Sequence, residues 1–264
     1  YSWEDNQYSS HEAKVLDFAV SSMGANNLQT GNKLDVGNVK SDKNDYKLIS
    51  MFARAHYSYK ERYMITATVR RDGSSKFGAN NKWGTFPSVS AAWGISEEAF
   101  MQDVNWLTDL KLRAGYGITG NQDGLQPYKS IELYEAKGTY YSDGSQLTAF
   151  RVSQNANPDL KWETTKSVNL GLDFSVLGGR VFGNYEFYVS KTSDLIYDVE
   201  IPHMNGMVTN SIPTNIGKLR NIGHEFSITG IPIVNKDFQW TITANFSLNK
   251  NKVESILGID ANKD

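Results

Sequence analysis

The chain has 264 residues, a net charge of −2 and no cysteine. That length allows one large domain or two ordinary ones. The nearly balanced charge leaves no basic surface for nucleic acid, and the absence of cysteine excludes a disulfide framework and a thiolate metal site. No run of about 18 apolar residues predicts a transmembrane helix, and no apolar signal-peptide segment stands at the start.

The first part of the chain carries little regular pattern. Residues 1–44 are rich in Asn, Ser, Gly and Lys, which favour turns and loops. We therefore expect a strand end followed by a long loop.

An alternation of apolar and polar side chains then begins and repeats along the chain. Before the Lys60-Glu61 turn, Ala53 and Ala55 alternate with Arg54 and His56. Because successive side chains of a strand point to opposite faces, this period of two predicts a sheet with one apolar and one polar face. Only His224 interrupts the apolar side, and we place it near a strand end, where a membrane interface would tolerate it.

The alternation predicts eight strands of about ten residues each, longer than the five or six that are usual in sheets. Their ranges are 46–59, 62–72, 85–95, 111–119, 162–175, 180–190, 222–233 and 238–249. The apolar side includes Ile65, Leu170 and Ile242, which we expect to contact lipid. Ten tilted residues are the length that an apolar membrane band needs.

Short and long connections alternate between these strands. The short ones are 60–61, 177–179 and 234–237, and the long ones are about 73–84, 120–161 and 191–221. Short turns at one rim and long loops at the other are typical of outer-membrane barrels. In the remaining connection, Ser96 before Glu97 and Glu98 predicts the start of a short helix.

These features together predict an all-β, antiparallel, up-and-down transmembrane β-barrel. Residues 1–44 would form an extracellular loop region and residues 45–264 a partial barrel domain. A mean hydropathy of −0.47 fits, since half of each strand faces water. The 14 tyrosines and 6 tryptophans would supply the aromatic girdles at the two interfaces. A soluble β-sandwich, acting as a carbohydrate-binding module, also alternates and stays open as an alternative.

Catalytic and cofactor sites find little support in the sequence. Residues 115–120 match G-x-G-x-x-G, but loop residues follow where a dinucleotide site needs a helix. The four histidines lack zinc-ligand spacing, and residues 42–45 lack the Gly and Glu of a calcium loop. The adjacent Glu97 and Glu98 suit a helix first turn better than a glycosidase pair. We expect no enzyme activity and no cofactor.

Binding and transport are the functions that the sequence still allows. Charged residues on the polar side would be costly in a dry core, so we expect them to meet a plug domain or passing solute inside the barrel. These lumen candidates are Arg54, Arg70, Arg113, Asp173, Glu186 and Glu225. Aromatic residues of the predicted loops would stack on sugar rings. The ligand-contacting candidates are Trp83, Tyr128, Tyr140 and Tyr141.

Four segments, in this order and spacing, carry more specific information than the alternation of apolar and polar residues. They are Arg71-Asp72-Gly73-Ser74-Ser75-Lys76-Phe77-Gly78, Tyr116-Gly117-Ile118-Thr119-Gly120-Asn121-Gln122, Asn157-Pro158-Asp159-Leu160-Lys161-Trp162-Glu163, and the set Asn215, Gly217, Asn221, Gly223 and Glu225. From about residue 45 onward, the chain resembles the SusC/RagA family of TonB-linked outer-membrane transporters of Bacteroidetes-type bacteria.

The resemblance implies a barrel of about 22 strands with an N-terminal plug that contacts the TonB complex. It further implies a SusD-like lipoprotein partner that captures glycan oligosaccharides or peptides for import. This chain would then be an internal piece of a longer protein, without plug or closing strand. A passive porin-like barrel is the alternative. Among the loop residues, we expect the tyrosines of 120–161 to face solute and Ile201, Met204 and Met207 to meet the lipoprotein.

Overall fold

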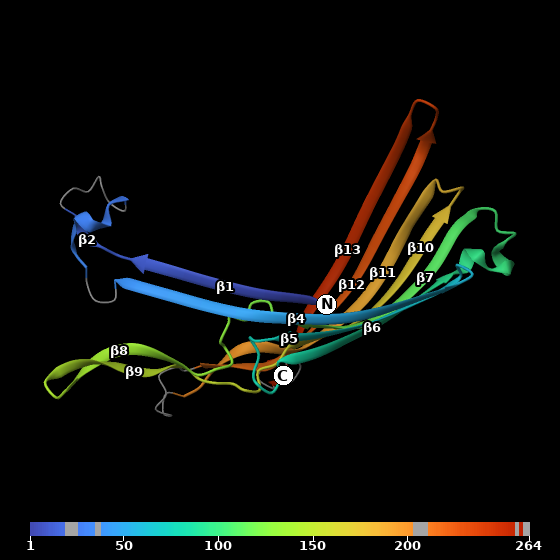
Figure 1. The fold of residues 1–264 in the computed structure, drawn as a ribbon. Helices are drawn as coiled ribbons and strands as arrows, with labels where there is room; N and C mark the ends of the chain where they lie inside the picture. The colour runs from blue at the N-terminus through green and yellow to red at the C-terminus, as the bar shows by residue number, and fades with distance from the viewer. Residues whose placement is uncertain (19–25, 35–37, 203–210, 257–258, 261–264) are drawn as a thin grey trace.

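The computed structural model describes residues 1–18, 26–34, 38–202, 211–256 and 259–260. Ten strands form one antiparallel sheet in the order β1-β4-β5-β6-β7-β10-β11-β12-β13-β14. These strands are β1 (Ser2–Ala13), β4 (Val39–Tyr59), β5 (Tyr63–Ser74), β6 (Trp83–Gly94), β7 (Leu107–Asn121), β10 (Glu163–Val176), β11 (Val181–Glu200), β12 (Ser211–Val234), β13 (Gln239–Ile256) and β14 (Ile259–Asp260). Figure 1 shows this sheet as an open, curved wall.

The other elements are small. Two two-stranded sheets are inserted between wall strands, β2 (Leu16–Phe18) with β3 (Gly31–Lys33), and β8 (Leu133–Ser142) with β9 (Ser145–Gln154). The 3₁₀ turns that lie wholly within the described residues are η2 (Leu28–Thr30), η3 (Ile95–Glu97) and η4 (Ala99–Met101). No helix in the described part of the chain is long and apolar enough to cross a membrane.

The register confirms the two faces of the sheet. Residues directly opposite each other in an antiparallel pair lie on the same face. Leu170 pairs with Phe187 on one side, here called the apolar face. Arg54 pairs with Thr68 on the other side, here called the polar face, as Glu186 pairs with Glu225. The fold is therefore the predicted antiparallel, up-and-down barrel wall.

The apolar face is uncovered. The side chains of Ile65, Leu170 and Ile242 are 50%, 46% and 48% exposed. A β-sandwich would bury them against a second large sheet, and the other sheets of the described residues have two strands each. The sandwich alternative is therefore wrong.

The two rims differ as predicted. At one rim, here called the turn rim, Lys60 and Glu61 have φ values of 52° and 58°, as the tight turns that join twisted hairpin strands require. The turns after Val176 and Val234 lie at the same rim, at the upper right of Figure 1. The opposite rim, here called the loop rim, carries the long connections and the β8–β9 hairpin.

Much of the predicted loop sequence is strand. Ser2–Ala13 forms a full strand, β1, which pairs along its whole length with β4, where we expected only a strand end. Nearly every residue of β1 is exposed, and a strand exposed on both faces needs no alternation. The division of the chain at residue 44 stays a prediction, although Asp42 to Asp45 lie inside β4 rather than in a loop.

The loop predicted at 191–221 is also mostly strand, because β11 continues to Glu200 and β12 begins at Ser211. A register shift between Thr192 and Leu195 breaks the period of two on which the prediction depended. This extension places His224 well inside β12 rather than near its end. There its Nδ1 atom lies 2.7 Å from the Tyr185 hydroxyl, which satisfies the ring on the apolar face.

The short helix predicted at Ser96 is wrong. Two single 3₁₀ turns occupy this connection, and neither has a side-chain cap. The Ser96 hydroxyl instead donates a hydrogen bond to Asp109 over 3.0 Å. Glu98 accepts hydrogen bonds from Tyr63 at 2.5 Å and from Trp93 at 3.0 Å, which ties the turn to β5 and β6.

Candidate functional site

An ion cluster occupies the polar face between β7, β10 and β11. Arg113 donates two hydrogen bonds to the Asp173 carboxylate, at 2.8 and 2.9 Å, and a third to Glu186 at 2.8 Å. Gly171 stands opposite Arg113 in the register, and a Cβ atom there would lie 2.9 Å from the guanidinium carbon. The glycine thus lets the guanidinium lie flat across β10 and reach both carboxylates.

A hollow of about 430 Å³ lies beside this cluster, within the size range of ligand pockets. Its lining includes His56, Thr66, Ser90, Arg113 and Glu186. The His56 Nδ1 atom lies 2.9 Å from the Thr66 hydroxyl. Hydroxyl, amide and charged groups here offer donors and acceptors to a polar ligand, and the arrangement is that of a binding surface.

The other lumen candidates lie on the same face but apart from the cluster. Arg54 donates to Thr68 over 3.2 Å, and Arg70 donates to both Asp72 oxygens over 2.8 Å. Glu225 is exposed and stands opposite Glu186. The structure therefore brings Arg113, Asp173 and Glu186 together with Glu225 beside them. A plug or solute contact for any of these residues stays a prediction.

A second centre lies at the loop rim, where the main buried core of the wall is found. Five buried side chains form it, here called the loop-rim junction: Phe77, Phe86, Leu125, Leu160 and Trp162. Phe77 and Leu160 are 1% and 0% exposed. The ring centroids of Phe77 and Trp162 are 4.5 Å apart, and those of Phe86 and Trp162 are 5.6 Å apart in an edge-to-face arrangement.

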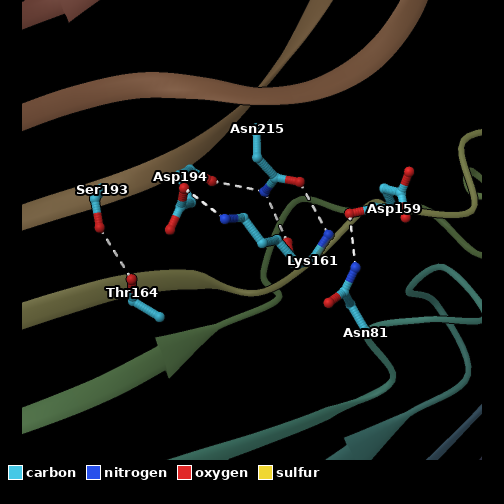
Figure 2. A network of polar contacts seen from close by, with 7 residues as sticks. All are labelled: Asn81, Asp159, Lys161, Thr164, Ser193, Asp194 and Asn215. Atoms are coloured by element: carbon cyan, nitrogen blue, oxygen red, sulfur yellow. Dashed lines mark hydrogen bonds and ion pairs between the residues drawn. The ribbon is translucent and has the colours of Figure 1, made fainter.

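The junction is fastened by hydrogen bonds between segments far apart in sequence, as Figure 2 shows. Asn81 donates to the Asp159 carbonyl over 2.9 Å. Asn215 accepts from the Lys161 N–H over 2.9 Å and donates to the carbonyls of Lys161 and Asp194, each over 2.7 Å. The Lys161 ammonium lies 3.0 Å from an Asp194 carboxylate oxygen. These contacts join the β5–β6 connection, the segment that precedes β10, and the strands β11 and β12.

One glycine of the G-x-G-x-x-G match, Gly120, contributes to this junction. A Cβ atom at Gly120 would lie 2.0 Å from the Phe86 ring, so glycine leaves room for that ring. Residues 115–120 lie wholly within β7 and are followed by no helix. The site next to them is a hollow of about 380 Å³ whose lining includes Arg70, Asp72, Asn121 and Asp123. This hollow could not be predicted from the sequence, because its lining residues come from five separate segments of the chain.

The four candidate aromatic residues do not converge. Trp83 stands on the apolar face with its ring over Arg71, whose guanidinium carbon lies 5.5 Å from the ring centroid. This placement suits a membrane-interface anchor and points away from the polar face. Tyr140 and Tyr141 are 52% and 76% exposed in β8, and adjacent residues of a strand point to opposite faces.

Tyr128 is held in place by a carboxylate. It donates a short hydrogen bond to Asp45 and accepts the Asp45 N–H over 3.0 Å, which fastens the 120–161 connection to β4. The bond to Asp45 raises the pKa of the Tyr128 hydroxyl above its usual value. Met204 and Met207 lie outside the described residues, and Ile201 is partly exposed at the end of β11. Ligand contacts of these aromatic residues stay predictions.

These observations define a class of protein: a wall segment of a β-barrel with an apolar outer face, a polar inner face and a built-up loop rim. A family model described as TonB dependent receptor-like, beta-barrel matches residues 4–263. TonB-dependent receptor SusC of Bacteroides thetaiotaomicron is 44% identical over 218 residues, which cover 81% of this chain and 21% of that protein. TonB-dependent receptor P26 of Formosa agariphila is 39% identical over 250 residues, covering 94% and 25%.

Solved structures support the same family. The RagAB peptide transporter matches with a TM-score of 0.84 at 29% identity, over 97% of this chain and 28% of that chain. The siderophore receptor PirA from Acinetobacter baumannii, at 17% identity and a TM-score of 0.52, shares the fold alone. The chain belongs to the TonB-dependent receptor family, in its SusC/RagA branch. It spans between a fifth and about a quarter of the curated relatives' length.

Proposed function

We propose that this chain is part of the barrel of an energy-coupled outer-membrane transporter that imports oligosaccharides or peptides. The chain would supply wall and loop-rim elements. A plug domain elsewhere in the protein would contact the TonB complex, and a SusD-like surface lipoprotein would deliver the solute. We propose no catalytic role and no cofactor for these residues.

The observation that carries this proposal is the difference between the two faces of one sheet. The uncovered apolar face suits lipid, and the polar face holds the Arg113 ion cluster beside an open hollow. Only a wall between lipid and water needs both. The relatives named as TonB-dependent receptors and the RagAB peptide transporter support coupled import over passive diffusion.

We assign the polar-face charges to the contact between wall and plug. Arg113, Asp173 and Glu186 are each about one-third exposed, so they can form further hydrogen bonds without leaving the cluster. Glu225, Arg54 and Arg70 would extend the same surface along the wall. A contact with passing solute is the second role that the same groups could serve.

Uptake by the bacterium that carries the gene tests the proposal. The full-length gene is deleted, and accumulation of labelled oligosaccharides and of labelled peptides is measured with and without a functional TonB complex. Energy-coupled import predicts that deletion of either the gene or TonB abolishes uptake of one solute class. Uptake that needs the gene but not TonB would show a passive barrel, and full uptake of both classes without the gene would refute the proposal.

The lipoprotein partner is tested separately by affinity purification of the tagged full-length protein from outer membranes. We expect a lipoprotein in about equal amount with the transporter. A matched tagged barrel protein from the same membranes controls for adventitious lipoproteins. A transporter purified alone, yet active in uptake, would remove the partner from the proposal.

A further inference from the structure

Four basic residues stand side by side on the apolar face near the loop rim. Lys166 of β10 pairs with Lys191 of β11, Lys191 pairs with Arg220 of β12, and Arg220 pairs with Lys252 of β13. Residues directly opposite each other on neighbouring strands lie on the same face with Cβ atoms about 5 Å apart. We call these four residues the basic row. It crosses four consecutive strands of the wall, seen next to each other in Figure 1.

The basic row borders the apolar band. One step toward the turn rim, β10, β11 and β12 carry Val168, Val189 and Ile222 in register, and β13 carries a further basic residue, Lys250, opposite Ile222. Below these come rows that include the pairs Leu170 with Phe187, Leu172 with Tyr185, and Phe226 with Phe246. Rows are two residues, or about 6.7 Å, apart along a strand. The basic row thus lies where an apolar band of about 25 Å would give way to headgroups.

Like charges opposite each other destabilise a sheet, and the protein supplies little to compensate for them. Among the described residues, neither Lys166, Lys191 nor Arg220 forms an ion pair with a carboxylate. The Arg220 Nε atom is buried and has no hydrogen-bond partner. Nearby, Asp194 is already paired with Lys161, and Glu254 follows Lys252 by two residues in β13. Lys166, Lys191 and Arg220 therefore keep an excess of positive charge within the described part of the chain.

We propose that the basic row binds the phosphate-bearing headgroup of a lipid in the leaflet at the loop rim. Arg and Lys are the side chains that bind phosphate oxygens, by charge-assisted hydrogen bonds. The acyl chains of the same lipid would lie on the apolar rows directly below. This inference rests on the proposed membrane location, and it assigns a lipid class to one leaflet.

The apolar face near the turn rim differs from the apolar face near the loop rim. On the apolar face near the turn rim stand aromatic side chains, among them Tyr57, Tyr59, Trp93 and Trp240, which are between 37% and 62% exposed. Aromatic residues anchor a wall at either interface without selecting charge. The basic residues at the turn rim, such as Lys60, Arg180 and Lys236, lie in separate turns, whereas the basic row at the loop rim is aligned by the strand register.

The test uses the full-length protein in a neutral detergent with phosphatidic acid as the probe. The variant K166Q/K191Q/R220Q removes three charges of the row. The matched control K60Q/R180Q/K236Q removes three exposed charges at the turn rim. One basic residue near an anionic surface contributes about fivefold in affinity, so we expect the row variant to bind at least about tenfold more weakly. The control should change binding less than about twofold.

Two further probes separate the lipid from a free anion. Diacylglycerol with the same acyl chains should bind far more weakly than phosphatidic acid, and inorganic phosphate should leave the thermal midpoint unchanged. The charge-keeping variant K166R/K191R should bind like the unaltered protein, which shows that loss of charge rather than misfolding causes the effect. Binding should also weaken with salt.

Equal binding by the row variant and its control would overturn the inference, as would equal binding of diacylglycerol. Stabilisation by inorganic phosphate alone would indicate a free-anion site and overturn the lipid assignment. Uptake is measured in parallel on the same variants. Intact TonB-dependent uptake with no phosphate-lipid preference would leave the proposed transport function standing and remove this inference alone.

Discussion

The loop-rim junction should depend on Phe77 more than on any exposed aromatic of the same region. Phe77 is 1% exposed and packs on Trp162, whereas Phe150 of β9 is 71% exposed. Burying an aromatic side chain removes about 150–250 Å² from water, or about 4–6 kcal/mol at 25 cal/mol per Å². Since alanine keeps part of that area, Phe77→Ala should cost about 3–5 kcal/mol.

Hydrogen exchange of the Gly78 N–H in the full-length protein measures this cost locally. That N–H donates to the Leu160 carbonyl over 2.9 Å, so it exchanges only when the junction opens. A loss of about 3–5 kcal/mol should speed its exchange by a factor of about 100 to 4,000. Phe150→Ala is the matched control and should change it less than about threefold, because exposed substitutions cost about 0.5 kcal/mol or less. Equal acceleration by both variants, or by neither, would refute the junction as the element that holds the loop rim together.

Three further predictions follow from particular side chains. Ile65→Arg should destabilise the full-length protein in lipid vesicles by about 2–4 kcal/mol if the site lies near the bilayer midplane, measured by urea unfolding, and an unchanged midpoint would contradict lipid exposure. Asn215→Ala removes three hydrogen bonds from the junction, and at about 1 kcal/mol for each it should expose the 157–163 segment to protease. Because the bond to Asp45 raises the Tyr128 pKa, its stabilisation is present below the ordinary tyrosine pKa of about 10 and is lost as the pH rises through the raised value. Tyr128→Phe should therefore abolish any alkaline loosening of the 120–161 connection, and proteolysis that still rises with pH in this variant would rule out the bond as its cause.

The β8–β9 hairpin offers a test of binding at the loop rim. Deletion of residues 138–146 removes the tip of the hairpin together with Tyr140 and Tyr141, and it should lower uptake or lipoprotein binding by the full-length protein. The two single variants Tyr140→Ala and Tyr141→Ala should differ, because the side chains point to opposite faces of the strand. Unchanged uptake and unchanged lipoprotein binding in the deletion would remove any functional role from this loop.

Strand positions could be predicted from sequence wherever one face of a strand is apolar and the other polar. Ile65, Leu170 and Ile242 were predicted correctly to lie on the apolar face, because a sheet with one apolar and one polar face imposes a period of two on the sequence. The same signal fails for β1, where both faces are exposed, and for the end of β11, where the register shift moves residues to the other face. Long strands that project beyond the membrane carry no such constraint.

Functional residues were harder to predict, because they depend on the pairing of separate strands. Arg113, Asp173 and Glu186 lie on three strands, and only the register shows that they meet. Trp83 looked like a loop residue that could stack on a ligand, but it begins β6 on the apolar face. The sequence shows that an aromatic residue lies next to a turn, but it does not show which face of the sheet the side chain will occupy.

The segments that carry the family resemblance meet in the loop-rim junction. Phe77, Gly120, Trp162 and Asn215 come one from each of the four segments. Phe77 packs on Trp162, Gly120 leaves room for the Phe86 ring, and Asn215 accepts a hydrogen bond from Lys161. These residues therefore fasten the long connections to the wall, and Gly120 and Trp162 also border the hollow of about 380 Å³. Residues that contact solute have no such geometric requirement and can differ between barrels with the same junction. The family resemblance thus identifies the scaffold of a transporter, and the identity of the solute must be read from the hairpin and the polar face, where the side chains are free to vary.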